Sequence, residues 1–148
     1  MKYYIDERSC KVTENMENEI NDKIEYWIEI AAYDLATAKA LLETKRFLYV
    51  GFMCHQVIEK MLKAMFVIKF PTETPPYTHD LLKLAKVTSL CEKMSPDQNK
   101  FIDTLGPLNI ESRYPSVKEK IFSTLSKERC KLIINKTEGL FQWIKNQL

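Results

Sequence analysis

The sequence predicts an all-α protein, an up-down antiparallel bundle of about five helices. Apolar residues recur at helical spacing in several long segments, and no segment alternates between apolar and polar residues as a half-buried strand would. The 148 residues contain only three glycines, so tight turns between strands are scarce. A hydrophobic content of 45% and a charged content of 28% are typical of one globular domain with its own core.

Residues 1–21 are polar and acidic, and we expect them to form an N-terminal extension, a short helix or a partly mobile segment, before a helical domain of residues 22–148. The first helix of this domain should run from about Asp22 to Thr44, because apolar residues there form one stripe. The stripe consists of Ile24, Trp27, Ile28, Ala31, Leu35, Ala38, Leu41 and Leu42.

A second helix should run from about Phe47 to Lys69, and most of its surface is apolar. Because successive helical residues turn by about 100°, its polar side chains fall within one arc. We therefore expect this helix to be the central one, packed on several sides. The polar arc consists of His55, Gln56, Glu59, Lys60 and Lys63.

Local signals predict three further helices. The proline-rich residues 70–78 indicate a loop, after which Thr78 can cap a helix that runs to about Cys91. Ser95-Pro96-Asp97-Gln98 is a capping box with proline at the first helical position, and Gly106-Pro107 should kink or end the helix that follows. Residues 113–125 indicate a connection, and Ser126 can cap a last helix that runs to the end of the chain.

Several classes of site are absent from the sequence. It contains no glycine-rich phosphate loop. The four cysteines, at positions 10, 54, 91 and 130, lack the close spacing of zinc ligands, and we expect neither a metal nor a cofactor. No apolar run approaches the ~20 residues of a membrane span, and the N-terminus lacks the apolar core of a signal peptide. We therefore expect a cytoplasmic protein with free thiols and no membrane contact.

The charge is unevenly distributed along the chain. The net charge is +2, but residues 1–26 hold four basic and seven acidic side chains, whereas residues 113–148 hold eight basic and three acidic side chains. The C-terminal quarter could therefore face a polyanion. It could equally be a solvated helix face with an excess of lysine.

The polar arc of the second helix could carry function. His55, Glu59 and Lys63 follow one another at intervals of four residues, so they lie on one side of the helix. They form either a solvated face of a bundle helix or a polar groove. In a groove, His55 could act as an acid, a base or a phosphate donor.

Two further motifs leave similar alternatives. His79 lies in Thr78-His79-Asp80-Leu81 at a predicted helix start, which can serve as a cap alone or can hold a phosphate. Arg113 and Tyr114 precede a proline. A guanidinium suits a phosphate and a tyrosine ring suits a base, but the arginine could also bind only helix-end carbonyls.

The order and spacing of these motifs resemble the HEPN domain family of prokaryotic helical proteins, over about residues 24–144. The resemblance implies a helical bundle, usually a homodimer, which frequently pairs with a minimal nucleotidyltransferase as a toxin–antitoxin system. The motifs that carry it are Trp27, Ala32-Tyr33-Asp34-Leu35, Ala38, Leu41, Leu42, Phe52, His55-Gln56, Glu59-Lys60, Lys63-Ala64, Thr78-His79-Asp80-Leu81 and Arg113-Tyr114-Pro115.

Many members of this family resemble metal-independent endoribonucleases, whose signature is an arginine followed about four to six residues later by a histidine. Arg113 matches that arginine, but no histidine follows it at that spacing here. We therefore expect a non-catalytic module that binds a nucleotide, an RNA or a partner nucleotidyltransferase through its Arg-Tyr-Pro turn. The alternative is a degenerate endoribonuclease toxin that uses His55 or His79.

The resemblance and the polar arc together predict one site. Its ligand-binding or network residues should be Asp34, His55, Glu59, Lys63, His79, Arg113 and Tyr114. Within this set we expect a charged network between the long helices and the Arg-Tyr-Pro turn, made by Asp34, His55, Glu59 and Arg113.

Overall fold

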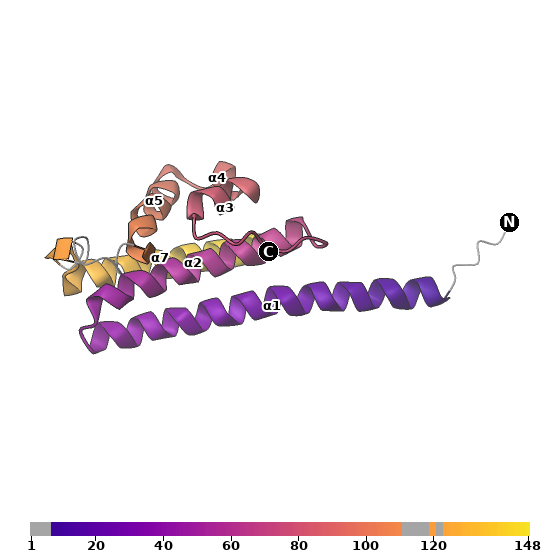
Figure 1. The fold of residues 1–148 in the computed structure, drawn as a ribbon, viewed down its shortest axis with the longest axis horizontal. Helices are drawn as coiled ribbons and strands as arrows, with labels where there is room; N and C mark the ends of the chain where they lie inside the picture. The colour runs from indigo at the N-terminus through magenta and orange to yellow at the C-terminus, as the bar shows by residue number, and fades with distance from the viewer. Residues whose placement is uncertain (1–6, 111–118, 121–122) are drawn as a thin grey trace.

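The computed structural model of the chain describes residues 7–110, 119–120 and 123–148. These residues form helices and no strands, which confirms the predicted all-α class. Helices α1 (Glu7–Glu43) and α2 (Phe47–Lys69) form a long antiparallel pair, and α7 (Lys127–Gln147) packs against both of them (Figure 1). Helices α3 (Leu81–Val87) and α5 (Pro96–Ile110) cover another part of α2, and the short α4 (Leu90–Lys93) lies beside α3.

Helix α1 begins 15 residues earlier than predicted, at Glu7 rather than at Asp22. The earlier segment lacks glycine and proline and is rich in glutamate, so its backbone can continue the helix. Residues 11–19 are all exposed, and Figure 1 shows this end of α1 projecting past the rest of the molecule. Residues 7–21 are therefore an extension of the first helix itself.

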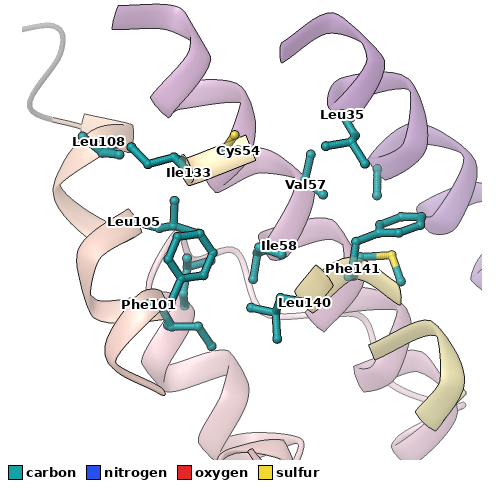
Figure 2. Packing of buried hydrophobic residues seen from close by; sticks show 14 of the residues in the cluster. Leu35, Cys54, Val57, Ile58, Phe101, Leu105, Leu108, Ile133, Leu140 and Phe141 are labelled. Atoms are coloured by element: carbon teal, nitrogen blue, oxygen red, sulfur yellow. The ribbon is translucent and has the colours of Figure 1, made fainter. Parts of the chain in front are cut away.

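Helix α2 is the central element, as predicted, because it contacts α1, α3, α5 and α7. Its apolar side chains and those of its neighbours form one core, which Figure 2 shows around Val57 and Ile58. A Cβ atom added to Gly51 would lie 3.0 Å from Cδ1 of Leu108, so glycine is what lets α5 approach α2 this closely.

Two predicted caps are confirmed. The side-chain oxygen of Ser95 accepts a hydrogen bond from the backbone N–H of Gln98 at 3.1 Å, and the Gln98 side chain accepts from the Ser95 N–H at 2.8 Å, which completes a capping box at α5. Ser126 caps α7 by accepting from the N–H of Arg129. The cap of α3 is Asp80 rather than Thr78; Asp80 accepts from the Lys83 N–H, while Thr78 accepts from the Asp80 N–H.

One predicted helix is divided in two, and helix α5 continues past the position where a kink or an end was expected. The helix predicted to run to about Cys91 is divided into α3 and α4 at Ser89, whose φ of 59° is left-handed and cannot continue a helix. Helix α5 does not end at Gly106-Pro107 but continues to Ile110. Pro107 removes one backbone hydrogen bond and crowds the carbonyl of the preceding turn, but Leu105 and Leu108, on either side of it, are both buried in the core and favour continuation of the helix.

The core contains two free thiols, Cys54 on α2 and Cys130 on α7. Burial raises the pKa of Cys54 to about 12 and that of Cys130 to about 11, so both remain protonated at neutral pH. Among the described helices, none is both long and apolar enough to cross a membrane.

Candidate functional site

The polar arc of α2 lies inside the molecule. The arc faces α1, α5 and the segment that leads into α3, so little of it meets solvent. His55 is 0% exposed, Glu59 is 3% exposed and Lys63 is 9% exposed. Burial of charged groups is unfavourable unless each finds a partner, so the contacts of these side chains define the site.

Glu59 is the centre of one cluster, which we call the Glu59 cluster: His55, Glu59, Lys63 and His79. One carboxylate oxygen of Glu59 accepts from Nζ of Lys63 at 2.7 Å, and the other accepts from Nδ1 of His79 at 3.0 Å. Burial alone would raise the pKa of Glu59, but the hydrogen bonds from Lys63 and His79 lower the pKa below its usual value. Glu59 is therefore ionised at neutral pH and holds the segment before α3 against α2.

His55 fixes the same segment through the backbone. Its Nε2 donates to the backbone oxygen of His79 at 3.1 Å, which places the lone pair of the neutral ring on Nδ1. That Nδ1 has no hydrogen-bond partner among the described residues and lies 3.6 Å from a Glu59 oxygen. Burial lowers the pKa of His55 to about 4 despite the nearby Glu59 charge, so the ring is neutral at neutral pH.

Asp34 belongs to a second, adjacent group of contacts. Lys60 donates to Asp34 of α1 and lies 3.4 Å from the side-chain oxygen of Gln56. Gln56 in turn donates to the side-chain oxygen of Asn109 at 2.9 Å, which ties α5 to α2. The structure therefore brings His55, Glu59, Lys63 and His79 together and pairs Asp34 with Lys60 instead.

Arg113 and Tyr114, the expected anion-binding corner of this network, lie outside the described residues. Both lysines of the polar arc are paired with carboxylates, Lys60 with Asp34 and Lys63 with Glu59. Neither lysine is therefore left to bind a phosphate. The direct effect of the polar arc is to join α1, α2 and α5 and to anchor the start of α3.

His79 is the member of the Glu59 cluster that reaches solvent, with 48% of its side chain exposed. Beside it lies a cavity of about 570 Å³ at the start of α3, which includes the fully exposed Tyr77 and two carboxylates, Asp80 and Asp103. A histidine oriented by a buried carboxylate is suited to proton transfer. The two aspartates, however, oppose the approach of a polyanion.

A basic groove lies elsewhere, between α5 and α7. The groove has a volume of about 230 Å³ and contains three cationic side chains, Lys100, Arg129 and Lys136, and one carboxylate, Asp97. Nζ of Lys136 lies 5.9 Å from the centre of the Phe101 ring. None of the three cations forms an ion pair within the part of the chain that the structure describes. We call these residues the α5–α7 groove.

A second cavity of about 480 Å³ adjoins the groove and shares Asp97, Phe101 and Lys136 with it. Trp143, which is partly buried, lies in this second cavity. Sequence reasoning missed Lys100 and Lys136 as site residues. The basic excess of residues 113–148 indicated a cationic face, but only the fold shows that Lys100 of α5 joins it.

The described residues contain no group of three or more histidine, cysteine, aspartate or glutamate side chains arranged to hold a metal ion. The candidate sites are therefore the Glu59 cluster with its acidic cavity and the α5–α7 groove. The first contains an oriented histidine and the second contains cations without an ion-pair partner among the described residues.

Comparison with known proteins agrees with this fold. The family model for the HEPN domain matches residues 24–147. The crystal structure of TT1696 from Thermus thermophilus superposes with a TM-score of 0.70 at 17% sequence identity, over 85% of this chain and 98% of that one. The crystal structure of ST0689, described as an archaeal HEPN homologue, gives a TM-score of 0.62 at 21% identity, over 84% of this chain and 96% of that one. No curated protein matches the chain.

Proposed function

Because the chain belongs to the HEPN domain family, we propose that it is a nucleotide- or RNA-binding module whose α5–α7 groove receives phosphate groups. One observation carries this proposal: Lys100, Arg129 and Lys136 meet in one groove beside a single carboxylate. These cations have no ion-pair partner among the described residues. Such cations gain most from a polyanion, because binding releases the counterions of the nucleic acid.

The surroundings of the groove support the same ligand. Glu138, an acidic residue of α7, is already paired with Lys39 of α1 at 2.8 Å, so its charge opposes the groove less. Arg129 can bind a phosphate through two parallel hydrogen bonds. Trp143, in the adjoining cavity, offers a ring on which a base could stack. Arg113 and Tyr114 remain proposed contributors to the same surface.

The test is the affinity of the purified protein for a fluorescent single-stranded RNA, measured by anisotropy at several salt concentrations. The variant Arg129→Gln/Lys136→Gln should bind about tenfold or more weakly and should lower the slope of log affinity against log salt by about 1.4, since each phosphate contact to a single strand contributes about 0.7. Lys11→Gln removes an exposed charge from α1 and should bind as the unmodified protein does. If both variants bind equally well, the groove is not the RNA site.

A second candidate function is a degenerate metal-independent endoribonuclease toxin. The observation that favours it is the hydrogen bond from His79 to the buried Glu59, which orients a half-exposed histidine. His55 is poorly suited to the same role because it is fully buried and neutral. Cleavage of a structured RNA that persists in His55→Gln and is lost in His79→Ala would favour the enzyme; binding without cleavage would favour the module.

Family membership also supports two proposed associations, a homodimer and a complex with a minimal nucleotidyltransferase in a toxin–antitoxin system. Co-expression with a nucleotidyltransferase encoded beside this gene, followed by purification through a tag on one protein, tests the second association. The two proteins should co-elute in a fixed ratio. Separate elution would leave the chain without that partner.

A further inference from the structure

Helix α1 exposes apolar side chains on a face that does not contact the core. Val12, Met16, Tyr26 and Tyr33 are 50% to 74% exposed. Solvated helix faces normally carry charged residues at such positions, and Met and Tyr are enriched at interfaces between proteins. We call the face that carries these residues the α1 outer stripe.

The outer stripe follows the spacing of a coiled coil. Its positions alternate between intervals of four and three residues, which is the heptad pattern of residues that meet a partner helix. On a helical wheel the stripe is centred about 120° away from the core-facing residues, so it is a separate face. Its positions are Val12, Met16, Glu19, Lys23, Tyr26, Ile30 and Tyr33.

The pattern is also self-complementary. A second copy of α1 that runs antiparallel, with a two-fold axis beside Asn21, places Glu19 of each copy opposite Lys23 of the other. The same arrangement places Met16 opposite Tyr26 and Val12 opposite Ile30. Opposite charges and apolar pairs thus match in one register, as a two-fold interface requires.

We propose that the α1 outer stripe is a homodimer interface, in which two α1 helices form an antiparallel coiled coil centred on Asn21. This interface deepens the dimer proposed above and rests on it. The occupant is a second copy because the chain itself supplies both halves of each charge pair. A partner with another sequence would not be expected to meet this internal symmetry.

The projection of α1 makes the arrangement geometrically feasible. Residues 11–19 are exposed, so the bundle is packed on the later part of the helix. In the antiparallel dimer the projecting segment of each copy lies along the packed segment of the other, and the two bundles lie at opposite ends. The family match begins at residue 24, so the projecting segment is additional to the matched HEPN region.

The dimer would also provide packing contacts for the projecting segment of α1. An isolated helix of a few turns is marginal in water, and most helical stability in proteins comes from packing. Residues 11–19 are all exposed within one copy. Packing against the partner would bury Val12 and Met16 and would hold the segment helical.

Reversal of the charges tests the register. Glu19→Lys places four lysines at the centre of the dimer, and Lys23→Glu places four glutamates there, so each single variant should dimerise about tenfold more weakly at low salt. A mixture of the two single variants should form a heterodimer, and the double variant Glu19→Lys/Lys23→Glu should recover the homodimer, because both restore opposite charges. Glu17→Lys makes the same charge change on another face and serves as the control.

Sedimentation equilibrium of the full chain measures each dissociation constant, and circular dichroism measures helix content in the same samples. Weakened single variants, a heterodimer on mixing and an unaffected Glu17→Lys would support the interface. A dimer that tolerates both single reversals would overturn the outer stripe as its interface while leaving the proposed dimer in place. A chain that remains monomeric at about 100 μM would overturn both.

Discussion

Acidification from pH 7 to pH 5 should destabilise the fold through His55. In the unfolded chain this histidine has an ordinary pKa of 6.5, whereas burial lowers its pKa in the folded protein to about 4. Between these values the unfolded chain binds a proton that the folded protein excludes. Stability is therefore complete above pH 6.5 and falls as the pH decreases toward 4. Down to pH 5 the loss amounts to about 2 kcal/mol of unfolding free energy, because each pH unit contributes about 1.4 kcal/mol.

The groups that face His55 do not reverse this sign. Burial is the largest effect and lowers the pKa of His55. Glu59, at 3.6 Å, and the hydrogen bond to the backbone oxygen of His79 favour the charged ring, whereas the charges of His79 and Lys63 oppose it. The pKa of Glu59 is itself lowered, so its own contribution is lost at pH values below this window. The decline between pH 6.5 and pH 5 therefore reports mainly on His55.

Urea unfolding followed by circular dichroism at pH 7, 6 and 5 measures the effect. His55→Gln retains an N–H that can donate to the backbone oxygen of His79 and has no titratable ring, so its stability should vary much less over this range. His79→Gln removes the half-exposed histidine, and its stability should still fall by most of the same amount between pH 7 and pH 5. A pH dependence that is the same in His55→Gln and in the unmodified protein would refute the reasoning.

Three further predictions concern stability measured by the same method. Glu59→Leu leaves the buried Lys63 without its counter-charge and should lower the free energy of unfolding by about 3–5 kcal/mol. The double variant Glu59→Leu/Lys63→Met should recover much of that stability. An equal loss in both variants would mean that the ion pair is not the cause. In Gly139→Ala the added methyl group meets no neighbouring atom within 4 Å, so the variant should be more stable by up to about 1 kcal/mol. In Gly51→Ala the methyl group meets a side chain of α5, so this variant should be less stable by about 1–3 kcal/mol. Equal effects would refute the close approach of α2 and α5. Ser126→Ala removes the cap of α7 and should cost about 1 kcal/mol, whereas no change would mean that the cap is dispensable.

The features that could be predicted from the sequence depend on short-range interactions. A capping box needs only residues three apart, so Ser95 and Ser126 identified two helix starts correctly. The apolar stripes likewise identified the long helices. The left-handed residue at Ser89 could not be predicted in this way, because nothing in its neighbours demands a positive φ.

In the candidate site, too, short-range features could be predicted from the sequence and tertiary contacts could not. Helical spacing placed His55, Glu59 and Lys63 on one side of α2. Whether that side faces water depends on the segment that leads into α3, which brings His79 onto Glu59 across 20 residues of sequence. The α5–α7 groove also depends on tertiary contacts, because its cations come from two helices that are far apart in the sequence. Pairings over such distances leave no periodic signal in a single sequence.

Chemical labelling of the two buried thiols, Cys54 and Cys130, can measure how often the core opens. A maleimide reacts with thiolate, so Cys54 and Cys130 should be modified only when the helices around them separate. Their labelling rates at neutral pH would then report how often α2 and α7 part, at one position on each helix. The partly buried Cys91, outside that contact, should react earlier and would provide an internal time reference.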